Sequence, residues 1–296
     1  MERLVKTLGW IIVSGRPKHW VKNLVVFGAL VFSQNLGNTA MLVQVAETFA
    51  LFCLASAAVY LINDIADREQ DRFHPEKKDR PIAAGKLGVG PAASAAVLFI
   101  GLALLGAYAL RPLVFLIMAG YVTLNLAYSF YLKNVILLDA FSIALGFVFR
   151  VVAGAEVIQV EISAWIVLCT VLGSLFLAFS KRRHELGLEE TAANHRPALA
   201  HYSTYFLDQM IAVVTASTVM AYALWTMWPS VAEKFHTHRL PWTIPFVCYG
   251  IFRYLYLVHQ KGEGGSPTKI FISDPPMLIN ITLWMGSVVA ILYFQP

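Results

Sequence analysis

Four oxygen-bearing side chains recur at helical spacing in the segment "NDIADREQD": Asn63, Asp64, Asp67 and Asp71. Spacings of three and four residues place them on one face of a helix, where carboxylates repel one another unless a cation lies between them. Oxygen ligands on one face suit Mg²⁺, which shares its remaining coordination positions with waters and substrate phosphates. We therefore predict a magnesium site at Asn63, Asp64 and Asp67, with Asp71 completing or orienting the ligand set.

Basic residues follow this acidic segment directly. The stretch "HPEKKDRPIAAGK" supplies Lys77, Lys78 and Arg80. Carboxylates for a metal and cations for phosphate, side by side, are the groups that a diphosphate substrate requires. The alternative is a solvated helix end at which the acids pair with Arg68, Arg72 and Lys78.

The remainder of the chain is apolar. It is 58% hydrophobic and only 14% charged, with a mean hydropathy of +0.62, whereas a soluble domain is typically about 25% charged. Runs of roughly 20 apolar residues recur, each long enough to cross a bilayer. Backbone groups must pair within such a segment, so helices are expected. The composition predicts an all-α polytopic membrane protein.

Nine spans are expected, near residues 22–38, 42–62, 91–110, 112–131, 135–155, 163–180, 205–228, 241–259 and 276–294. Residues 1–21 are expected to form an amphipathic helix at the membrane surface rather than a cleavable signal peptide, with Trp10 and Trp20 at the level of the headgroups.

The basic residues predict the orientation of the spans. One set of connections carries Arg3, Lys6, Arg16, Lys18, Lys22, Arg68, Arg72, Lys77, Lys78, Arg80, Lys86, Lys133, Lys181, Arg182, Arg183, Arg196, Lys261 and Lys269. The alternate connections carry Arg111, Arg150, Lys234 and Arg239. The basic side is expected to be cytoplasmic, which places the N-terminus inside and the C-terminus outside. Anionic lipid and this rule explain the formal charge of +5 without a nucleic-acid partner.

The pattern N-D-x-x-D-x-x-x-D followed by R-P-I-x-x-G resembles the first motif of the UbiA superfamily of intramembrane prenyltransferases. The resemblance implies a nine-helix bundle that forms a single domain over residues 1–296. It also implies a Mg²⁺-dependent active site in cytoplasmic loops, which would here be residues 63–90 and 181–204. Ordinary members of the family hold a prenyl diphosphate between this motif and a second acidic motif, D-x-x-x-D.

The second motif departs from the family pattern. In "SKRRHELGLEE", Lys181 stands where the first aspartate is expected, and Glu185 follows four residues later. Replacing an acid by a cation changes the local charge by two units, so a different donor is expected. Lys181, Arg182 and Arg183 would suit a donor with more phosphate, and Glu185 would bind a second metal or a sugar hydroxyl. The alternative for Arg182 and Arg183 is a positively charged anchor at a helix end.

Further segments resemble one branch of the family: "SGRPKHWVKN", "GFVFRVVAGA" and "HYSTYFLDQM". That branch transfers the phosphoribosyl group of 5-phosphoribosyl 1-diphosphate to a polyprenyl (decaprenyl) phosphate and releases diphosphate. The product feeds cell-envelope arabinan synthesis at the bacterial cytoplasmic membrane. The nucleophile would be an ionised lipid phosphate, so catalysis would rest on positioning and charge stabilisation rather than on a strong base.

Cations elsewhere in the chain are candidates for phosphate binding. Lys18, Lys22 and Arg16 would draw in the lipid headgroup, although the same residues would also bind anionic lipid. Arg253, about two turns from the cytoplasmic end of its span, would reach a phosphate. Arg150 lies deeper, and a structural pair with Glu156 is an alternative for it.

Three other functions are compatible with parts of the sequence. A prenyltransferase with a prenyl diphosphate donor and an aromatic or lipid acceptor is disfavoured by Lys181. A lipid transporter is disfavoured because the charges gather on one side rather than near the midplane. A non-catalytic scaffold would not need Asp64 for Mg²⁺-dependent donor binding. A homo-oligomer is compatible with each of these functions.

Overall fold

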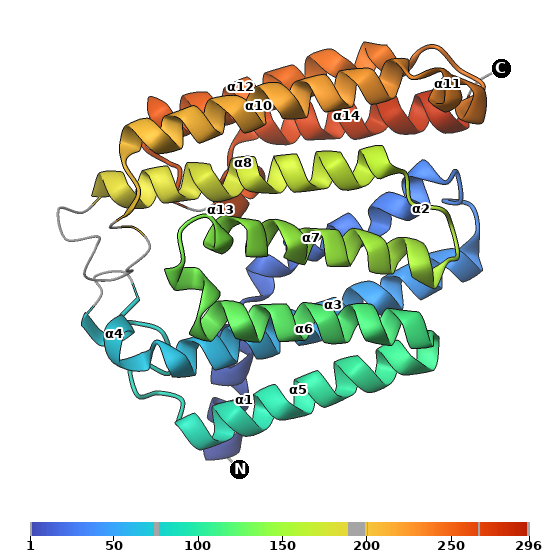
Figure 1. Ribbon diagram of the computed structural model, residues 1–296. Helices are drawn as coiled ribbons and strands as arrows, with labels where there is room; N and C mark the ends of the chain where they lie inside the picture. Colours follow the sequence, from blue (N-terminus) through green and yellow to red (C-terminus); the bar gives the residue numbers. More distant parts are fainter. Residues whose placement is uncertain (1, 74–76, 189–198, 200, 266, 295–296) are drawn as a thin grey trace. The chain divides into compact units, whose positions relative to one another are not determined.

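The computed structural model describes residues 2–73, 77–188, 199, 201–265 and 267–294, and it contains helices and no strand in those residues. Figure 1 shows their course along the chain. The elements are α1 (Glu2–Ser14), the 3-10 helix η1 (Pro17–Phe27), α2 (Gly28–Phe32), α3 (Thr39–Ala66), α4 (Arg68–Phe73), α5 (Val89–Leu110), α6 (Pro112–Phe130), η2 (Leu132–Asn134), α7 (Leu138–Val157), α8 (Ala164–Leu188), α10 (Thr204–Met227), α11 (Pro229–Phe235), η4 (Leu240–Thr243), α12 (Ile244–His259), α13 (Pro267–Ser273) and α14 (Pro275–Tyr293).

Seven helices in the described part of the chain are long and apolar enough to cross a membrane: α3, α5, α6, α7, α8, α10 and α14. The all-α, multi-pass prediction is therefore confirmed, but the count of nine spans is not. The expected span at 22–38 is divided between η1 and the five-residue α2. The expected span at 241–259 contains α12, whose 16 residues extend only about 24 Å, less than the thickness of a bilayer's hydrocarbon core.

The interruption of the first expected span has a local cause. Gln34 adopts a left-handed backbone conformation, with φ of 60°, and its side-chain amide donates a hydrogen bond to the carbonyl of Leu292 at 2.7 Å. Asn38 then caps α3, because its side chain accepts a hydrogen bond from the Met41 N–H at 3.2 Å. The chain therefore starts a new helix instead of extending α2.

The helix expected over residues 1–21 is shorter in the structure, because α1 ends at Ser14 in a sharp turn. Several apolar side chains of α1 are exposed, including Val5, Leu8 and Ile12, as expected for a helix at a membrane surface. The turn at Gly15 is tight, since a Cβ there would lie 3.2 Å from the Cβ of Ala57. Arg16 follows with φ of 51° and starts η1.

The chain divides into two compact units, and the first comprises Met1–Leu30, Leu36–Ser142 and Phe149–Glu161. Its α3 packs against α5, and α5 packs against α6. A core of small and branched residues lies between α3, α5 and the preceding loop: Ala58, Leu61, Ile82, Leu87, Ala92, Ala95 and Ala96. Small residues allow membrane helices to approach closely. This packing holds the carboxyl end of α3, and with it the predicted acidic site.

The second unit comprises Val31–Asn35, Ile143–Val148 and Ile162–Pro296. Here α8 packs along α10, and α12 packs along α14. Tyr222 is at the centre of its core: its hydroxyl lies 2.7 Å from the Thr243 hydroxyl and accepts a hydrogen bond from the Trp284 indole at 2.9 Å. The buried Tyr222 hydroxyl is thus paired, as a core requires of its polar groups.

Candidate active site

The four oxygen-bearing residues of the acidic segment do not lie on one continuous helix. Asn63 and Asp64 lie in the last turn of α3, Asp67 is its C-cap, and Asp71 lies in the short helix α4. The Asp71 N–H still donates to the Asp67 carbonyl at 2.8 Å. The expected single helix is therefore wrong in detail, but the turn keeps the four side chains in one region of the first unit.

Arg80 joins two of the carboxylates. Its Nη1 donates to Asp71 Oδ2 at 2.6 Å and to Asp64 Oδ1 at 3.1 Å. The Asp64 and Asp71 side chains are only 2% and 5% exposed. Since buried carboxylates need paired charges or hydrogen bonds, the guanidinium of Arg80 explains how two of them lie side by side.

Arg16 supplies a second cation to Asp64. Its Nη2 donates to Asp64 Oδ1, and its guanidinium lies 4.7 Å from the centroid of the Tyr60 ring. The His19 ring also packs against Tyr60, edge to face, with 5.6 Å between the ring centroids. The turn at Gly15 and the cation–π contact thus bring the N-terminal segment to the acidic site.

The third aspartate has partners of its own. Asp67 Oδ2 accepts a hydrogen bond from the Asn63 amide at 3.0 Å, and Asp67 Oδ1 pairs with the Lys133 ammonium. Lys133 lies in η2, 66 residues along the chain from Asp67. Three cations therefore face three aspartates in this cluster.

The solvated-helix alternative is wrong in its pairing. Arg68 and Arg72 both pair with the exposed carboxylate of Glu69, at 2.5 and 2.9 Å. Arg68 lowers the pKa of Glu69, mainly through its hydrogen bond. Lys78 is exposed and makes no hydrogen bond or ion pair with any residue that the structure describes. The three aspartates instead face more buried cations.

The donor chemistry of the cluster fits a hard divalent cation, although its present arrangement is not a coordination sphere. Among the described residues, no three His, Cys, Asp or Glu side chains are close enough to hold a metal ion. The Asn63 amide and the three carboxylates are all oxygen donors, as Mg²⁺ prefers. A metal would have to replace the contacts that Arg16, Arg80 and Lys133 make, so the magnesium site stays a prediction.

Arg150 is buried in the first unit and donates hydrogen bonds to neutral acceptors. Its Nε donates to Asn23 Oδ1 at 2.6 Å, and its Nη2 donates to the Tyr121 hydroxyl at 2.8 Å. The guanidinium also lies 4.7 Å from the centroid of the Tyr121 ring. Glu156, the alternative partner from the sequence, lies 3.9 Å from Arg111 instead.

Lys22 lies beside this arginine. In the described residues its ammonium forms no hydrogen bond or ion pair. Burial, followed by the nearby charges of Arg150 and Arg16, lowers the pKa of Lys22 to about 8. A cation with other cations as neighbours favours the binding of an anion. Lys18, in the same 3-10 helix, is exposed.

The second polar motif lies in the second unit, at the end of α8. Glu185 receives two cations: Arg182 Nη1 donates to its Oε2, and the Lys181 ammonium lies 3.7 Å from its Oε1. The Arg182 side chain is 1% exposed, whereas that of Lys181 is 39% exposed. Lys181 is therefore the accessible cation of the pair, and Arg182 serves to hold Glu185.

Arg253 is engaged by a carboxylate at the start of the last helix. Its Nη2 and Nε donate to the two oxygens of Asp274 at 2.8 and 3.2 Å. Asp274 also caps α14, since it accepts a hydrogen bond from the Met277 N–H at 2.9 Å. The hydrogen bond from Arg253 lowers the pKa of Asp274. This geometry gives Arg253 a structural contact, and its phosphate contact stays a prediction.

Sequence reasoning missed two members of the acidic cluster. The sequence places Lys133 on the basic side of the membrane, and Arg16 on that side as a candidate for the lipid headgroup, but it links neither of them to the aspartates. The alternation of basic connections places both on the same side as Asp64, and that signal could have linked them. Their specific contacts depend on chain turns at Gly15 and before α7 that no periodicity encodes.

Comparisons with known proteins agree with these features. The model of the UbiA prenyltransferase family matches residues 8–281. Decaprenyl-phosphate phosphoribosyltransferase from Corynebacterium glutamicum is 35% identical over 97% of this chain and 87% of the relative. The protein of the same name from Mycolicibacterium smegmatis is 34% identical over 96% of this chain and 93% of the relative.

A solved structure shows the same fold. A UbiA homolog from Archaeoglobus fulgidus bound to GPP and Mg²⁺ superposes with a TM-score of 0.72 at 20% sequence identity, and the match covers 96% of this chain and 99% of that one. The match of the family model and of the relatives extends along nearly the whole chain. The chain belongs to the UbiA prenyltransferase family, as its first acidic motif predicts.

Proposed function

We propose that this membrane enzyme transfers a 5-phosphoribosyl group from 5-phosphoribosyl 1-diphosphate to decaprenyl phosphate and releases diphosphate. The observation that carries the proposal is the similarity, over nearly the full length of both chains, to relatives named decaprenyl-phosphate phosphoribosyltransferase. The cation at position 181 supports it, because an ordinary prenyl diphosphate donor is expected to need an acid there.

The first unit would bind the diphosphate of the donor. Asn63, Asp64 and Asp67 would hold Mg²⁺, which would neutralise negative charge on the leaving diphosphate. Solved structures of UbiA homologs bound to Mg²⁺ support a divalent cation in this fold. Arg80, already placed between Asp64 and Asp71, would turn to the phosphate oxygens. Lys77 and Lys78 lie just before Arg80 in the chain and would add charge from the solvent side.

The acceptor phosphate would bind at Lys22. Its ammonium, with Arg150 and Arg16 nearby, offers the positive charge that a lipid phosphate requires, and Lys18 would add an exposed cation at the membrane surface. The attacking phosphate oxygen is ionised at neutral pH, so the chain has to orient it rather than deprotonate it. Attack opposite to the leaving diphosphate inverts the anomeric carbon of the ribose.

The second unit carries the other predicted site residues. Lys181 is a candidate contact for a 5-phosphate, and Glu185 for a ribose hydroxyl or a second metal ion. Arg182, buried against Glu185, would orient that carboxylate. Arg253 remains a candidate phosphate ligand only if it releases Asp274.

The proposed setting is the bacterial cytoplasmic membrane, with the acidic cluster on the cytoplasmic side and the C-terminus outside. The positive-inside rule supports this orientation, because basic residues concentrate in the connections around the cluster. A water-soluble sugar phosphate donor would reach the site from the cytoplasm, and the acceptor would reach it through the bilayer. The product would serve cell-envelope arabinan synthesis.

The test supplies purified protein in detergent with decaprenyl phosphate, Mg²⁺ and radiolabelled 5-phosphoribosyl 1-diphosphate. We expect label to enter the lipid phase and to disappear on addition of a chelator. Prenyl transfer to an aromatic acceptor without labelled lipid would replace the proposal with ordinary prenyltransferase activity. A Lys181→Asp variant separates the two donors, since it restores the acid of the common family motif.

A further inference from the structure

The loop that follows α12 packs directly on the side chain of His184, near the end of α8. A Cβ at Gly264 would lie 2.8 Å from the Cβ of His184, and a Cβ at Gly265 would lie 2.7 Å from its Nε2. Since Cβ atoms in proteins do not approach other atoms this closely, an alanine at either position requires the loop or the imidazole to move. Gly264 is buried, so the backbone of the loop itself forms the contact.

Backbone contacts at the end of α12 direct this loop toward α8. Gly262 adopts a left-handed conformation, with φ of 66°, which glycine adopts at no steric cost. The Glu263 N–H then donates to the carbonyl of Leu257 at 3.0 Å, so the chain turns back along the last turn of α12. A Cβ at Gly264 would also lie 3.3 Å from Val258 Cγ1. The loop is therefore held against its own helix as well as against α8.

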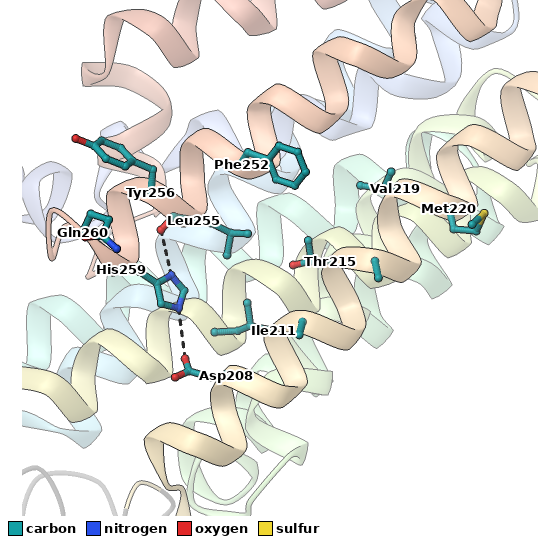
Figure 2. A pocket seen from close by; sticks show the side chains of 12 residues that line it. Asp208, Ile211, Thr215, Val219, Met220, Phe252, Leu255, Tyr256, His259 and Gln260 are labelled. Atoms are coloured by element: carbon teal, nitrogen blue, oxygen red, sulfur yellow. Dashed lines mark hydrogen bonds and ion pairs between the residues drawn. The ribbon is translucent and has the colours of Figure 1, made fainter.

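The residue before His184 is held by a second contact with the end of α12. Arg183 Nε donates to Asp208 Oδ1 of α10 at 3.0 Å, and the same oxygen lies 3.3 Å from His259 Nε2. Figure 2 shows Asp208 and His259 facing one another from α10 and α12. All of these residues belong to the second unit. The end of α8 is thus fixed through two successive side chains.

The position of His184 on α8 links the loop to Lys181 and Glu185. Lys181 lies three residues before His184 and four before Glu185, so both are its neighbours on the helix, one on each side. The Lys181 ammonium lies 3.7 Å from Glu185 Oε1, and its side chain is 39% exposed. A ligand can therefore reach this ammonium. An imidazole that the loop holds in place limits the directions in which the ammonium extends.

We propose that His184, Gly264 and Gly265 are positioning residues for Lys181, which they hold ready for a phosphate group of the sugar-phosphate donor. The inference rests on the proposed function, in which Lys181 is a candidate contact for the 5-phosphate. The three residues act through Lys181 and not on the reacting atoms. They favour binding of the donor, because a long side chain whose directions are already restricted loses less freedom when a ligand binds.

Steady-state kinetics of the purified full chain in detergent test the inference, with radiolabelled 5-phosphoribosyl 1-diphosphate and decaprenyl phosphate. Gly264→Ala pushes the loop away from α8, and Gly265→Ala displaces the imidazole. Each is expected to raise the KM for the donor by about three- to tenfold, with kcat and the KM for the acceptor changed by less than about twofold. Gly173→Ala is the matched control, because Gly173 lies on α8 and a Cβ there meets nothing within 4 Å.

Combination with His184→Ala separates positioning from a general loss of stability. This substitution removes the ring but keeps the Cβ, so it makes room for Gly265→Ala and not for Gly264→Ala. His184→Ala alone is expected to raise the donor KM by about threefold. Adding Gly265→Ala is expected to cause no further increase, whereas adding Gly264→Ala is expected to raise the donor KM again.

Two results of these measurements would contradict the positioning role. A donor KM that stays at the wild-type value in both glycine variants would show that the loop does not position Lys181. Equal changes of kcat and of both KM values, together with a lowered Tm, would make the contact purely structural. If Gly264→Ala fails to fold, Gly265→Ala and its combination with His184→Ala decide between the two roles.

Lys181→Met tests the contact on which the inference rests. We expect it to raise the donor KM at least as much as the glycine variants do. A wild-type donor KM in Lys181→Met, with label still entering the lipid, would overturn the inference and leave the proposed reaction standing. Absence of labelled lipid with the wild-type protein would instead overturn the proposed function, and the inference with it.

Discussion

Arg80 contacts two carboxylates at once, and this contact explains how acidic residues accumulate at the end of a membrane helix. Asp64 and Asp71 are nearly inaccessible, so their charges depend on Arg80 and Arg16 rather than on water. A ligand that brings its own metal and phosphates would exchange partners with these residues. If a diphosphate and Mg²⁺ bound here, Mg²⁺ would pair with the carboxylates and the diphosphate with the cations, so that no buried charge would be left unpaired.

Asp64→Asn and Asp67→Asn are each expected to lower turnover by at least about 100-fold, because each removes one predicted metal ligand. The measurement is the rate of label transfer to lipid at saturating Mg²⁺, with thermal unfolding followed in parallel. Glu69→Gln is the control, since Glu69 is an exposed carboxylate nearby that pairs only with Arg68 and Arg72 among the described contacts. Near-normal activity of both aspartate variants would remove the metal site from the proposal.

The lowered pKa of Lys22 predicts that binding of the acceptor depends on pH. Its pKa is lowered to about 8 by burial and by Arg150 and Arg16, while Tyr121 and Tyr128 oppose that shift. The free enzyme therefore loses this positive charge as the pH rises through about 8. The KM for decaprenyl phosphate is expected to rise between pH 7 and pH 9.

The control for this pH dependence is Lys22→Arg. A guanidinium stays protonated over the whole range, so the variant is expected to show a flatter KM profile. Titration of the substrates affects both proteins equally. Identical profiles for the two proteins would show that Lys22 does not bind the acceptor phosphate.

At the scale of elements, Gly154 determines how closely η1 approaches α7. A Cβ at this position would lie 2.1 Å from the carbonyl oxygen of Val26, a backbone atom that cannot rotate away. Gly154→Ala is expected to lower the free energy of unfolding by about 1–3 kcal/mol and to disturb the contact of Asn23 with Arg150. Thermal unfolding in detergent measures the first effect. Gly101→Ala is the control, because a Cβ at Gly101 meets nothing within 4 Å, and it is expected to leave stability unchanged or higher. Equal effects of the two substitutions on stability would contradict the close approach of η1 to α7.

The contact between Arg253 and Asp274 ties α12 to the start of α14. The pKa of Asp274 is lowered in the folded protein. The ionised carboxylate therefore stabilises the fold at any pH above the ordinary aspartate pKa of about 3.9. This stabilisation is lost as the pH falls through the lowered pKa of the folded protein. Asp274→Asn is expected to have a lower Tm than the wild type at pH 7. The difference in Tm between the two proteins is expected to be smaller at pH 3. A constant difference in Tm between the two pH values would show that the ion pair adds nothing to the cap.

At the scale of the whole molecule, the sequence predicts the class of the fold better than its details. Long apolar runs are sufficient for an all-α membrane protein, and the order N-D-x-x-D followed by R-P-I is sufficient for the family. The first expected span fails because hydropathy does not register the left-handed backbone at Gln34. The pairing of Arg253 with Asp274 was not predicted, because Asp274 lies 21 residues away in sequence. Local sequence patterns predict which segments are apolar and helical. Contacts between side chains that are far apart in the sequence depend instead on how the helices pack.

The most direct measurement is transfer of radiolabel from 5-phosphoribosyl 1-diphosphate to decaprenyl phosphate by the purified protein, with and without chelator. Phosphoribosyl transfer predicts labelled lipid that depends on Mg²⁺ and on Asp64, and it predicts no transfer from a prenyl diphosphate. Absence of labelled lipid, together with prenylation of an aromatic acceptor by the same preparation, would contradict it and assign the protein to the prenyl-transferring members of its family.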